Sequence, residues 1–294
     1  MTTHCGFVAV IGRPNVGKST LINSVMGRKI SIVTAKPQTT RHRILAVHSE
    51  KNTQIIFVDT PGIHRKANRA MNRMMNRTAA SALADADLVL FVCDATRWTE
   101  EDDDVVHRLK SIKAPIIALL NKVDRVHPKE RLFAKLAELA ARLELTQIFP
   151  LSALKKSNLN ELMAAIPAFL PESPFLFPQE MHTDRGVEFQ AAEVIREKLT
   201  LMLHQEVPYG LTVQIERYTT AEEQVEIDAV IWVERDSQKG IVVGKGGQVL
   251  KTVGQAARLE LCEQLQRRVH LEMWVKVKDN WSDSEQDLMR LDYE

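Results

Sequence analysis

The sequence has few of the features that would set it apart from an ordinary globular protein. Its three cysteines, Cys5, Cys93 and Cys262, are too few and too far apart for a disulfide framework or a zinc cage, and they suggest a reducing compartment. Aromatic residues make up only 5% of the 294 residues. No apolar run approaches the ~20 residues that cross a bilayer. The first residues lack the basic and apolar stretches of a secretory signal. We therefore expect a soluble, cytoplasmic protein.

The charges are nearly balanced over the whole chain but not within each half. Residues 1–180 carry 25 basic and 17 acidic side chains, whereas residues 181–294 carry 14 and 21. Such a change of sign fits two domains with different partners. Between them, residues 167–178 contain four prolines, which favour an extended, stiff segment. We predict domains at residues 1–168 and 184–294 joined by a proline-rich linker at 169–183. A long loop within one domain is the alternative.

The first half alternates short apolar runs with stretches of helical spacing. The apolar runs are Gly6–Ile11, Ile55–Asp59, Leu88–Asp94, Ile116–Asn121 and Gln147–Leu151. Longer segments between them, such as Arg131–Leu145, repeat leucine every three or four residues. This alternation predicts an α/β domain with a mostly parallel sheet and helices on both faces. Ligands of such sheets bind at the carboxyl ends of the strands.

A glycine-rich motif follows the first apolar run directly. Gly12–Ser19 matches G-x-x-x-x-G-K-[ST], and a helical segment begins at Ser19. The glycines let the backbone wrap a phosphate, so that its N–H groups and the helix N-terminus meet negative charge. In such a loop Lys18 reaches the β- and γ-phosphates, and the Ser19 hydroxyl binds Mg²⁺.

Three further motifs follow later apolar runs. In Asp59–Gly62 a carboxylate can hold the metal, directly or through water, and the Gly62 N–H can contact a γ-phosphate. In Asn121–Asp124 the carboxylate of Asp124 can accept two hydrogen bonds from guanine, which adenine cannot offer at that edge. If adenine entered this site, the buried charge of Asp124 would be left unpaired, which favours GTP over ATP. The third motif is Ser152–Ala153.

The ordered set of motifs resembles the TRAFAC-class GTPases. The sequences of Gly12–Leu21 and of Pro37–Arg41 are similar to those of the Era-like branch of that class. The resemblance implies that Thr40, or its neighbour Thr39, is the switch threonine, with switch segments at Ala35–Arg43 and Thr60–Arg77. It implies metal ligation by Ser19, Thr40 and Asp59, and catalytic roles for Lys18, Thr40 and Gly62. The GTP-binding residues it implies are Gly12, Arg13, Pro14, Asn15, Val16, Gly17, Lys18, Ser19, Thr20, Asp59, Thr60, Pro61, Gly62, Asn121, Lys122, Asp124, Ser152 and Ala153.

The residue after Gly62 departs from the Ras-like pattern. Ile63 stands where Ras-like enzymes have a glutamine that orients the attacking water, and its side chain can neither donate nor accept a hydrogen bond. Era-like proteins share an apolar residue here, so we expect slow intrinsic hydrolysis. Related GTPases also have an asparagine like Asn15 that helps hold K⁺. Whether Asn15 does so here is a hypothesis.

Two charged patterns stand out in the first half. Arg65, Arg69, Arg73 and Arg77 recur every four residues and would form a basic stripe, either a solvated helix face or a docking surface. The acidic run Glu100–Asp104 is typical of a solvated helix start.

The second half has the order α-β-β-α-loop-α-β, which resembles a type II KH domain. Its loop, Gly244–Gly247, fits G-x-x-G, and two glycines permit close approach of a nucleic-acid backbone. The surrounding stretch Ser237–Arg258 carries four basic residues and no acidic one. We predict RNA binding by Gly244, Lys245, Gly246, Gly247 and Lys251.

A GTPase domain followed by a type II KH domain resembles the bacterial Era family over nearly the whole chain. The resemblance implies a switch in which GTP and Mg²⁺ favour binding to the single-stranded 3′ end of small-subunit ribosomal RNA, in assembly of that subunit. It also implies a monomer and peripheral contact with the inner face of the cell membrane. The resemblance further implies that the tail from Trp281 touches RNA, but its acidic residues argue against simple phosphate contact.

Three alternatives compete with this interpretation. The first is a constitutive RNA-binding assembly factor whose nucleotide site is only structural, and the intact motifs argue against it without excluding it. The second is a P-loop ATPase or kinase, which Asp124 with Ser152–Ala153 disfavours. The third, a Rossmann dehydrogenase, fails because the first loop is not G-x-G-x-x-G.

Overall fold

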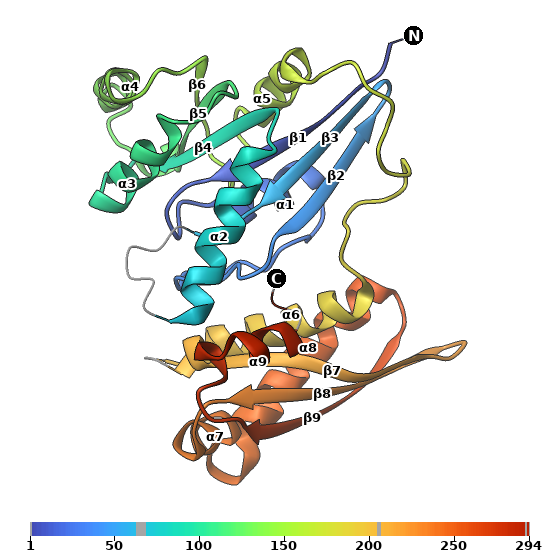
Figure 1. Ribbon diagram of the computed structural model, residues 1–294. Helices are drawn as coiled ribbons and strands as arrows, with labels where there is room; N and C mark the ends of the chain where they lie inside the picture. Colours follow the sequence, from blue (N-terminus) through green and yellow to red (C-terminus); the bar gives the residue numbers. More distant parts are fainter. Residues whose placement is uncertain (1, 63–68, 205–206, 292, 294) are drawn as a thin grey trace. The chain divides into compact units, whose positions relative to one another are not determined.

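The computed structural model describes residues 2–62, 69–204, 207–291 and 293. The chain divides into two compact units. The first unit ends at Asp184 and the second begins at Arg185, with Arg69–Met71 grouped with the second. Figure 1 traces the course of the chain through both units.

A six-stranded sheet is the centre of the first unit. Its order is β2 (Ile44–Glu50), β3 (Thr53–Asp59), β1 (His4–Ile11), β4 (Leu88–Asp94), β5 (Ile116–Asn121) and β6 (Gln147–Pro150). All neighbouring pairs are parallel except β2 with β3. The central strands β1 and β4 are almost wholly buried, which explains their unbroken apolar sequence.

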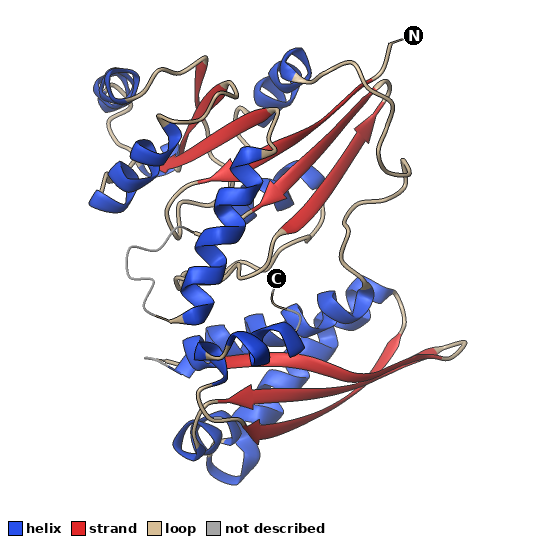
Figure 2. Cartoon of the chain, in the orientation of Figure 1, coloured by secondary structure: helices blue, strands red, loops and turns tan. Residues whose placement is uncertain are grey.

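Helices cover both faces of this sheet (Figure 2). One core packs α1 (Lys18–Met26) and α5 (Leu159–Ala165) against the sheet. The other contains side chains from α2 (Ala70–Ala84), α3 (Glu100–Leu109) and α4 (Arg131–Arg142). The predicted α/β class, a mostly parallel sheet with helices on both faces, is confirmed.

The sequence pattern did not identify β2, which is an antiparallel edge strand. Its outer edge pairs with the segment that was predicted as a linker. The Val47 N–H donates to the carbonyl of His182 over 3.0 Å, and Ala46 forms an antiparallel bridge with Thr183. The Leu45 N–H donates to Asp184 Oδ1 over 2.9 Å. Residues up to Asp184 are thus attached to the first unit, and the edge of the sheet is covered.

The second unit contains a three-stranded sheet with helices packed against it. The strands lie in the order β7 (Leu211–Thr220), β8 (Gln224–Val233) and β9 (Arg268–Val277), and β8 and β9 are parallel. The core is formed with α6 (Val187–Met202), α7 (Asp236–Val243) and α8 (Gln248–Leu265). The order α-β-β-α-α-β is the one predicted for a type II KH domain. No helix in the described part of the chain has the length and apolar character needed to cross a membrane.

The carboxyl-terminal segment packs onto the second unit. Trp281 is fully buried, and its indole N–H donates to the carbonyl of Gly210 over 3.1 Å. The hydroxyl of Tyr293 donates to Thr212 Oγ1 over 3.0 Å, and its ring lies against that of Trp281. Between them runs the short helix α9 (Glu285–Arg290). The indole of Trp281 is therefore a structural anchor.

Replacing this anchor is predicted to destabilise the second unit. Trp281→Ala removes a large buried side chain and leaves the Gly210 carbonyl without its donor, at a cost of about 3–5 kcal/mol. Hydrogen exchange of β7–β9 and urea unfolding measure this effect. The matched control is Met289→Ala on α9, whose side chain is 68% exposed and should cost less than about 0.5 kcal/mol. Equal losses for the two variants would contradict the prediction.

Candidate functional site

A cavity of about 350 Å³ lies where the motifs of the first unit meet. Their loops follow β1, β3, β5 and β6, so they converge on the carboxyl edge of the sheet. The predicted site residues that line it are Pro14, Asn15, Gly17, Lys18, Ser19, Thr20, Thr40, Gly62, Asn121, Lys122, Asp124, Ser152 and Ala153.

Two glycines of the phosphate loop are required by close backbone approach. A Cβ at Gly12 would lie 2.3 Å from the carbonyl oxygen of Val92 in β4. Gly17 has a φ of +106°, and a Cβ there would lie 2.4 Å from Asn121 Nδ2. The loop therefore lies tightly against the ends of two strands. Its N–H groups precede the N-terminus of α1, an arrangement suited to phosphate.

Lys18 is buried at the base of this loop. Its ammonium donates to the carbonyl of Gly12 over 2.9 Å and to that of Arg13 over 3.1 Å. Burial lowers the pKa of Lys18 to about 8, although the nearby Asp59 carboxylate raises it. A phosphate group entering the cavity would supply the negative charge that this lysine lacks.

Ser19, Thr40 and Asp59 form a compact group of oxygen atoms. Ser19 Oγ donates to Asp59 Oδ2 over 2.9 Å and lies 2.9 Å from Thr40 Oγ1. Asp59 is fully buried, and its Oδ1 atom accepts no hydrogen bond from the described residues. Burial raises the pKa of Asp59, with Lys18 and Ser19 opposing that shift. One carboxylate and two hydroxyl groups in a buried site fit Mg²⁺, which prefers oxygen ligands. Thr40 lies in this group, whereas Thr39 Oγ1 instead contacts Thr34 Oγ1 at 2.6 Å.

The side chain of Asn121 joins three loops. Its amide donates to the carbonyl of Val16 over 2.8 Å, and its Oδ1 atom accepts from the N–H groups of Lys122 and Ala153. The phosphate loop, the Asn121–Asp124 motif and the Ser152–Ala153 motif are therefore held in one arrangement. Asp124 lines the same cavity.

Some predicted residues do not line the cavity. They are Gly12, Arg13, Val16, Asp59, Thr60 and Pro61. Thr60 is buried and donates to the carbonyl of Val10 over 2.9 Å, so its side chain fastens the loop to β1. The Arg13 side chain is turned away, toward Asp102, and only its backbone carbonyl contacts Lys18.

The interpretation of the acidic run Glu100–Asp104 as a solvated helix start is wrong for Asp102. This residue is fully buried. Its Oδ2 atom accepts from the N–H and hydroxyl of Thr99, the N-cap of α3, and from Arg13 Nε. A carboxylate can be buried here because each of these donors compensates its lost hydration.

Other cavity-lining residues were not identified from the sequence. These are Ile32, Val33, Thr34 and Arg125, with Lys36, Gln38 and Leu154 in or beside segments already named. Apolar residues next to a predicted switch carry no chemical motif, so only the fold places them there.

Two of the sequence predictions fall partly outside the described residues. Ile63 and Arg65 lie there. The other arginines of the predicted stripe include Arg73 and Arg77, which are exposed on α2, with Met74 and Met75 buried on the same helix.

The Gly244–Gly247 loop joins α7 to α8 in the second unit. Gly244 has a φ of +72°, and a Cβ there would lie 2.4 Å from Val249 Cγ2. Gly246 and Gly247 also have positive φ, yet nothing lies within 4 Å of their Cβ positions. Lys245 and Lys251 are exposed. The loop therefore presents open backbone and positive charge at the N-terminus of α8.

The lowered pKa of Lys18 generates a prediction for nucleotide affinity. Below pH 8 the Lys18 side chain is protonated and can pair with a phosphate directly. Above pH 8 it is mostly neutral, so nucleotide binding must be accompanied by uptake of a proton. GDP affinity should therefore fall by up to about tenfold per pH unit as pH rises above 8. Calorimetric titration at about pH 7 and about pH 9 measures this change. Lys18→Met reports any effect of the guanine ring itself, and an equal pH dependence in both proteins would contradict the prediction.

Comparison with known families agrees with the two units. Residues 7–122 match a family described as 50S ribosome-binding GTPase, and residues 206–282 match the KH domain family.

Similar proteins extend over nearly the whole chain. The GTPase Era of Actinobacillus pleuropneumoniae serotype 5b is 46% identical over 292 residues, covering 99% of this chain and 96% of the relative. The Marinobacter nauticus GTPase Era is 46% identical, covering 98% and 95%. A crystal structure of Era with MgGDPNP and nucleotides 1506–1542 of 16S ribosomal RNA has a TM-score of 0.95 and 39% identity, covering 99% of each chain. A structure of an Aquifex aeolicus Era variant bound to GDP·AlF4⁻ gives the same values. With its phosphate loop, guanine motif and KH loop in place, the chain belongs to the Era family of GTPases.

Proposed function

We propose that this GTPase binds the 3′ region of small-subunit ribosomal RNA through its second unit and acts in assembly of the small ribosomal subunit. Its affinity for the RNA is higher with GTP bound than with GDP bound. The observation that carries the proposal is the presence of both sites in one chain. One is a cavity lined by Lys18, Ser19, Thr40 and Asp124, with Asp59 hydrogen-bonded to Ser19 behind it. The other is the open Gly244–Gly247 loop. A relative of the same fold binds a GTP analogue and 16S ribosomal RNA together.

The residues of the first unit fit the chemistry of GTP. Asp124 and Lys18 line the cavity, where Asp124 would accept hydrogen bonds from guanine and Lys18 would neutralise the β- and γ-phosphates. Ser19, Thr40 and Asp59 would hold Mg²⁺, which supplies positive charge to the phosphate oxygens as the γ-phosphate leaves. Since Ile63 cannot orient the attacking water, intrinsic hydrolysis is expected to be slow.

The path from nucleotide to RNA begins at Thr40. This residue lies four positions before Ile44, where β2 begins. The outer edge of β2 holds residues 182–184 through main-chain hydrogen bonds and the Asp184 carboxylate. The next residue, Arg185, opens the second unit. A shift of the first switch that moves β2 would therefore pull on the start of the RNA-binding unit.

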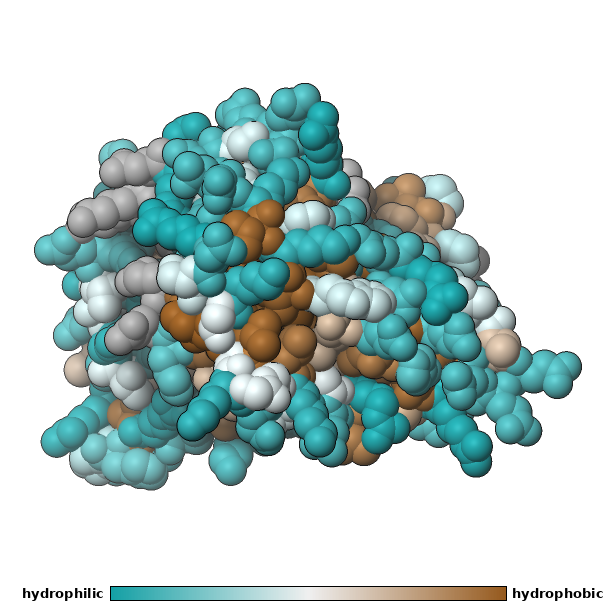
Figure 3. All heavy atoms as spheres, turned by 90° about the horizontal axis from the view of Figure 1, so that it is seen from below, coloured by the Kyte–Doolittle hydropathy of each residue, from teal (hydrophilic) through white to brown (hydrophobic). Residues whose placement is uncertain are grey.

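The second unit has the chemistry expected for single-stranded RNA. Its glycine loop allows a sugar–phosphate backbone to approach, beside Lys245 and Lys251. Ile241, on α7 just before this loop, is 50% exposed. Figure 3 shows apolar side chains gathered within a hydrophilic surround on the face seen from below. An exposed apolar side chain such as Ile241 beside a phosphate-binding loop suits contact with an unstacked base.

RNA binding in different nucleotide states tests the proposal. A labelled single-stranded RNA matching the 3′ end of small-subunit ribosomal RNA is titrated with GDP, with a non-hydrolysable GTP analogue, or without nucleotide. We expect the tightest binding with the analogue. Lys245→Asp with Gly246→Asp should weaken it by about tenfold or more, since two negative charges face the phosphates. Lys110→Asp, at an exposed lysine of the first unit, is the control.

A variant at Asp184 tests the path from β2 to the second unit. Asp184→Ala removes the acceptor of the Leu45 N–H, and it should reduce the difference in RNA affinity between the analogue-bound and GDP-bound protein without abolishing RNA binding.

Equal RNA affinity in all three nucleotide states would contradict the proposal and favour a constitutive RNA-binding factor. An absence of RNA binding in every state would leave only a GTPase.

We also propose that K⁺ stimulates hydrolysis through Asn15. The Asn15 amide donates to the carbonyl of Ala35 over 2.8 Å, which brings it to the first switch segment beside the phosphate loop. A cation held there would stabilise developing charge on the phosphates, as an arginine finger does.

Single-turnover hydrolysis in matched potassium and sodium buffers checks the role of K⁺. Potassium should accelerate hydrolysis by at least ~10-fold, and Asn15→Ala should abolish the difference. Equal hydrolysis rates for the unaltered protein in the two buffers would contradict the proposed role of K⁺.

Peripheral membrane contact, a cytoplasmic location and a monomeric state stay predictions.

A further inference from the structure

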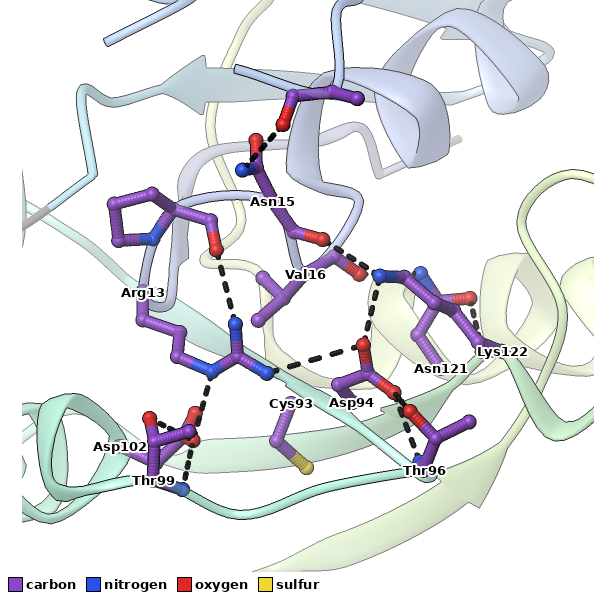
Figure 4. A network of polar contacts seen from close by, with 12 residues as sticks. Arg13, Asn15, Val16, Cys93, Asp94, Thr96, Thr99, Asp102, Asn121 and Lys122 are labelled. Carbon is purple, nitrogen blue, oxygen red and sulfur yellow. Dashed lines mark hydrogen bonds and ion pairs between the residues drawn. The ribbon is translucent and has the colours of Figure 1, made fainter. Parts of the chain in front are cut away.

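A network of charged groups lies behind the phosphate loop; Arg13, Asp94 and Asp102 are buried outside the nucleotide cavity, and Lys122 connects them to its lining. Figure 4 shows Arg13 between Asp102 and Asp94, with Lys122 on the far side of Asp94. The Arg13 side chain is only 2% exposed, although it belongs to the phosphate-loop motif. Sequence alone would assign that arginine to the nucleotide.

The first end of the network fixes the guanine motif. Lys122 Nζ donates to Asp94 Oδ2 and to the carbonyl of Asn15, each over 2.7 Å. Asp94 Oδ1 accepts from the N–H and hydroxyl of Thr96. Although burial opposes it, these donors hold the pKa of the Asp94 carboxyl below its usual range. Asp94 therefore holds Lys122 as a charged carboxylate.

The second end fixes the phosphate loop to α3. Arg13 Nε donates to Asp102 Oδ2 over 2.8 Å, and Arg13 Nη2 lies 3.8 Å from Asp94 Oδ2. Asp102 also closes the capping box of α3 with Thr99. Arg13 is thus the link between two buried carboxylates on different elements.

We propose that Arg13, Asp94 and Asp102 are positioning residues for guanine-nucleotide binding, acting through the phosphate loop and Lys122. The loop is held on both sides, at Arg13 by Asp102 and at Asn15 by Lys122. Asn15 and Lys122 both have positive φ, a conformation that non-glycine residues keep only when their surroundings fix it. The proposal rests on the proposed nucleotide site, and it makes the first turn of α3 part of the determinants of nucleotide affinity.

The experiment must separate lost positioning from the destabilisation that a buried charge causes when its partner is removed. Removing a single member of a buried ion pair is strongly destabilising, whereas neutral replacements of both are tolerated better. Asp94→Asn, Asp102→Asn and the double variant are therefore compared in the Arg13 protein and again with Arg13→Met. GDP and GTP-analogue affinities and single-turnover hydrolysis are measured for each. Arg108→Met, at an exposed arginine of α3, is the matched control.

The expected result is a coupling that depends on Arg13. Asp94→Asn and Asp102→Asn should each weaken GDP and GTP-analogue binding by about tenfold, the effect of losing one charge-assisted hydrogen bond. Together they should weaken binding by clearly less than the product of the two. With Arg13→Met the two effects should combine independently. Arg108→Met should leave both nucleotide affinities and hydrolysis unchanged, because Arg108 is exposed on α3.

Two results would overturn the inference. The first is GDP affinity within about twofold of the unaltered protein for Arg13→Met with Asp102→Asn, in folded protein. The second is independent effects of the two aspartate substitutions when Arg13 is present. Failure of the unaltered protein to bind GDP would instead overturn the proposed nucleotide site itself, so the two failures are distinguishable.

Discussion

The nucleotide site depends on one buried amide, the side chain of Asn121. It lies 2% exposed at the end of β5, where its Nδ2 and Oδ1 atoms bind the carbonyl of Val16 and the N–H of Ala153. It lies so close to Gly17 that a Cβ at that position would be 2.4 Å from Asn121 Nδ2. Loops from three strands are thereby fixed at one edge of the sheet, and binding groups fixed in advance lose less entropy when the nucleotide arrives.

The switch threonine of the nucleotide site is also linked to the start of the second unit through β2. Thr40 lies with Ser19 and Asp59, and the strand that follows it, β2, pairs with residues 182–184. An edge strand is well suited to this purpose because its outer hydrogen-bonding groups are available to another segment. What the sequence presents as a proline-rich linker belongs, up to Asp184, to the GTPase unit, and residues 182–184 pair with the edge of β2.

Much of this architecture could be predicted from the sequence, because its determinants are local. The motifs follow apolar runs directly, and the glycine loop of the second unit lies between two helices, so class, topology and the positions of the loops follow from short segments. The burial of the Arg13 side chain outside the nucleotide cavity could not be predicted. Its partner, Asp102, lies in an acidic run that resembles a solvated helix start and becomes buried only through tertiary packing. β2 and its pairing with residues 182–184 likewise depend on contacts between distant parts of the chain.

The proposed function requires that the nucleotide and the RNA are energetically coupled within one chain. Thermodynamic linkage makes such coupling reciprocal, so an RNA that binds better to the GTP state must favour that state in return. The most direct test is the ratio of GTP-analogue affinity to GDP affinity, measured with and without saturating RNA from the 3′ end of small-subunit ribosomal RNA. The account predicts that RNA raises this ratio. A ratio that RNA leaves unchanged would contradict it, and the two units would then act independently.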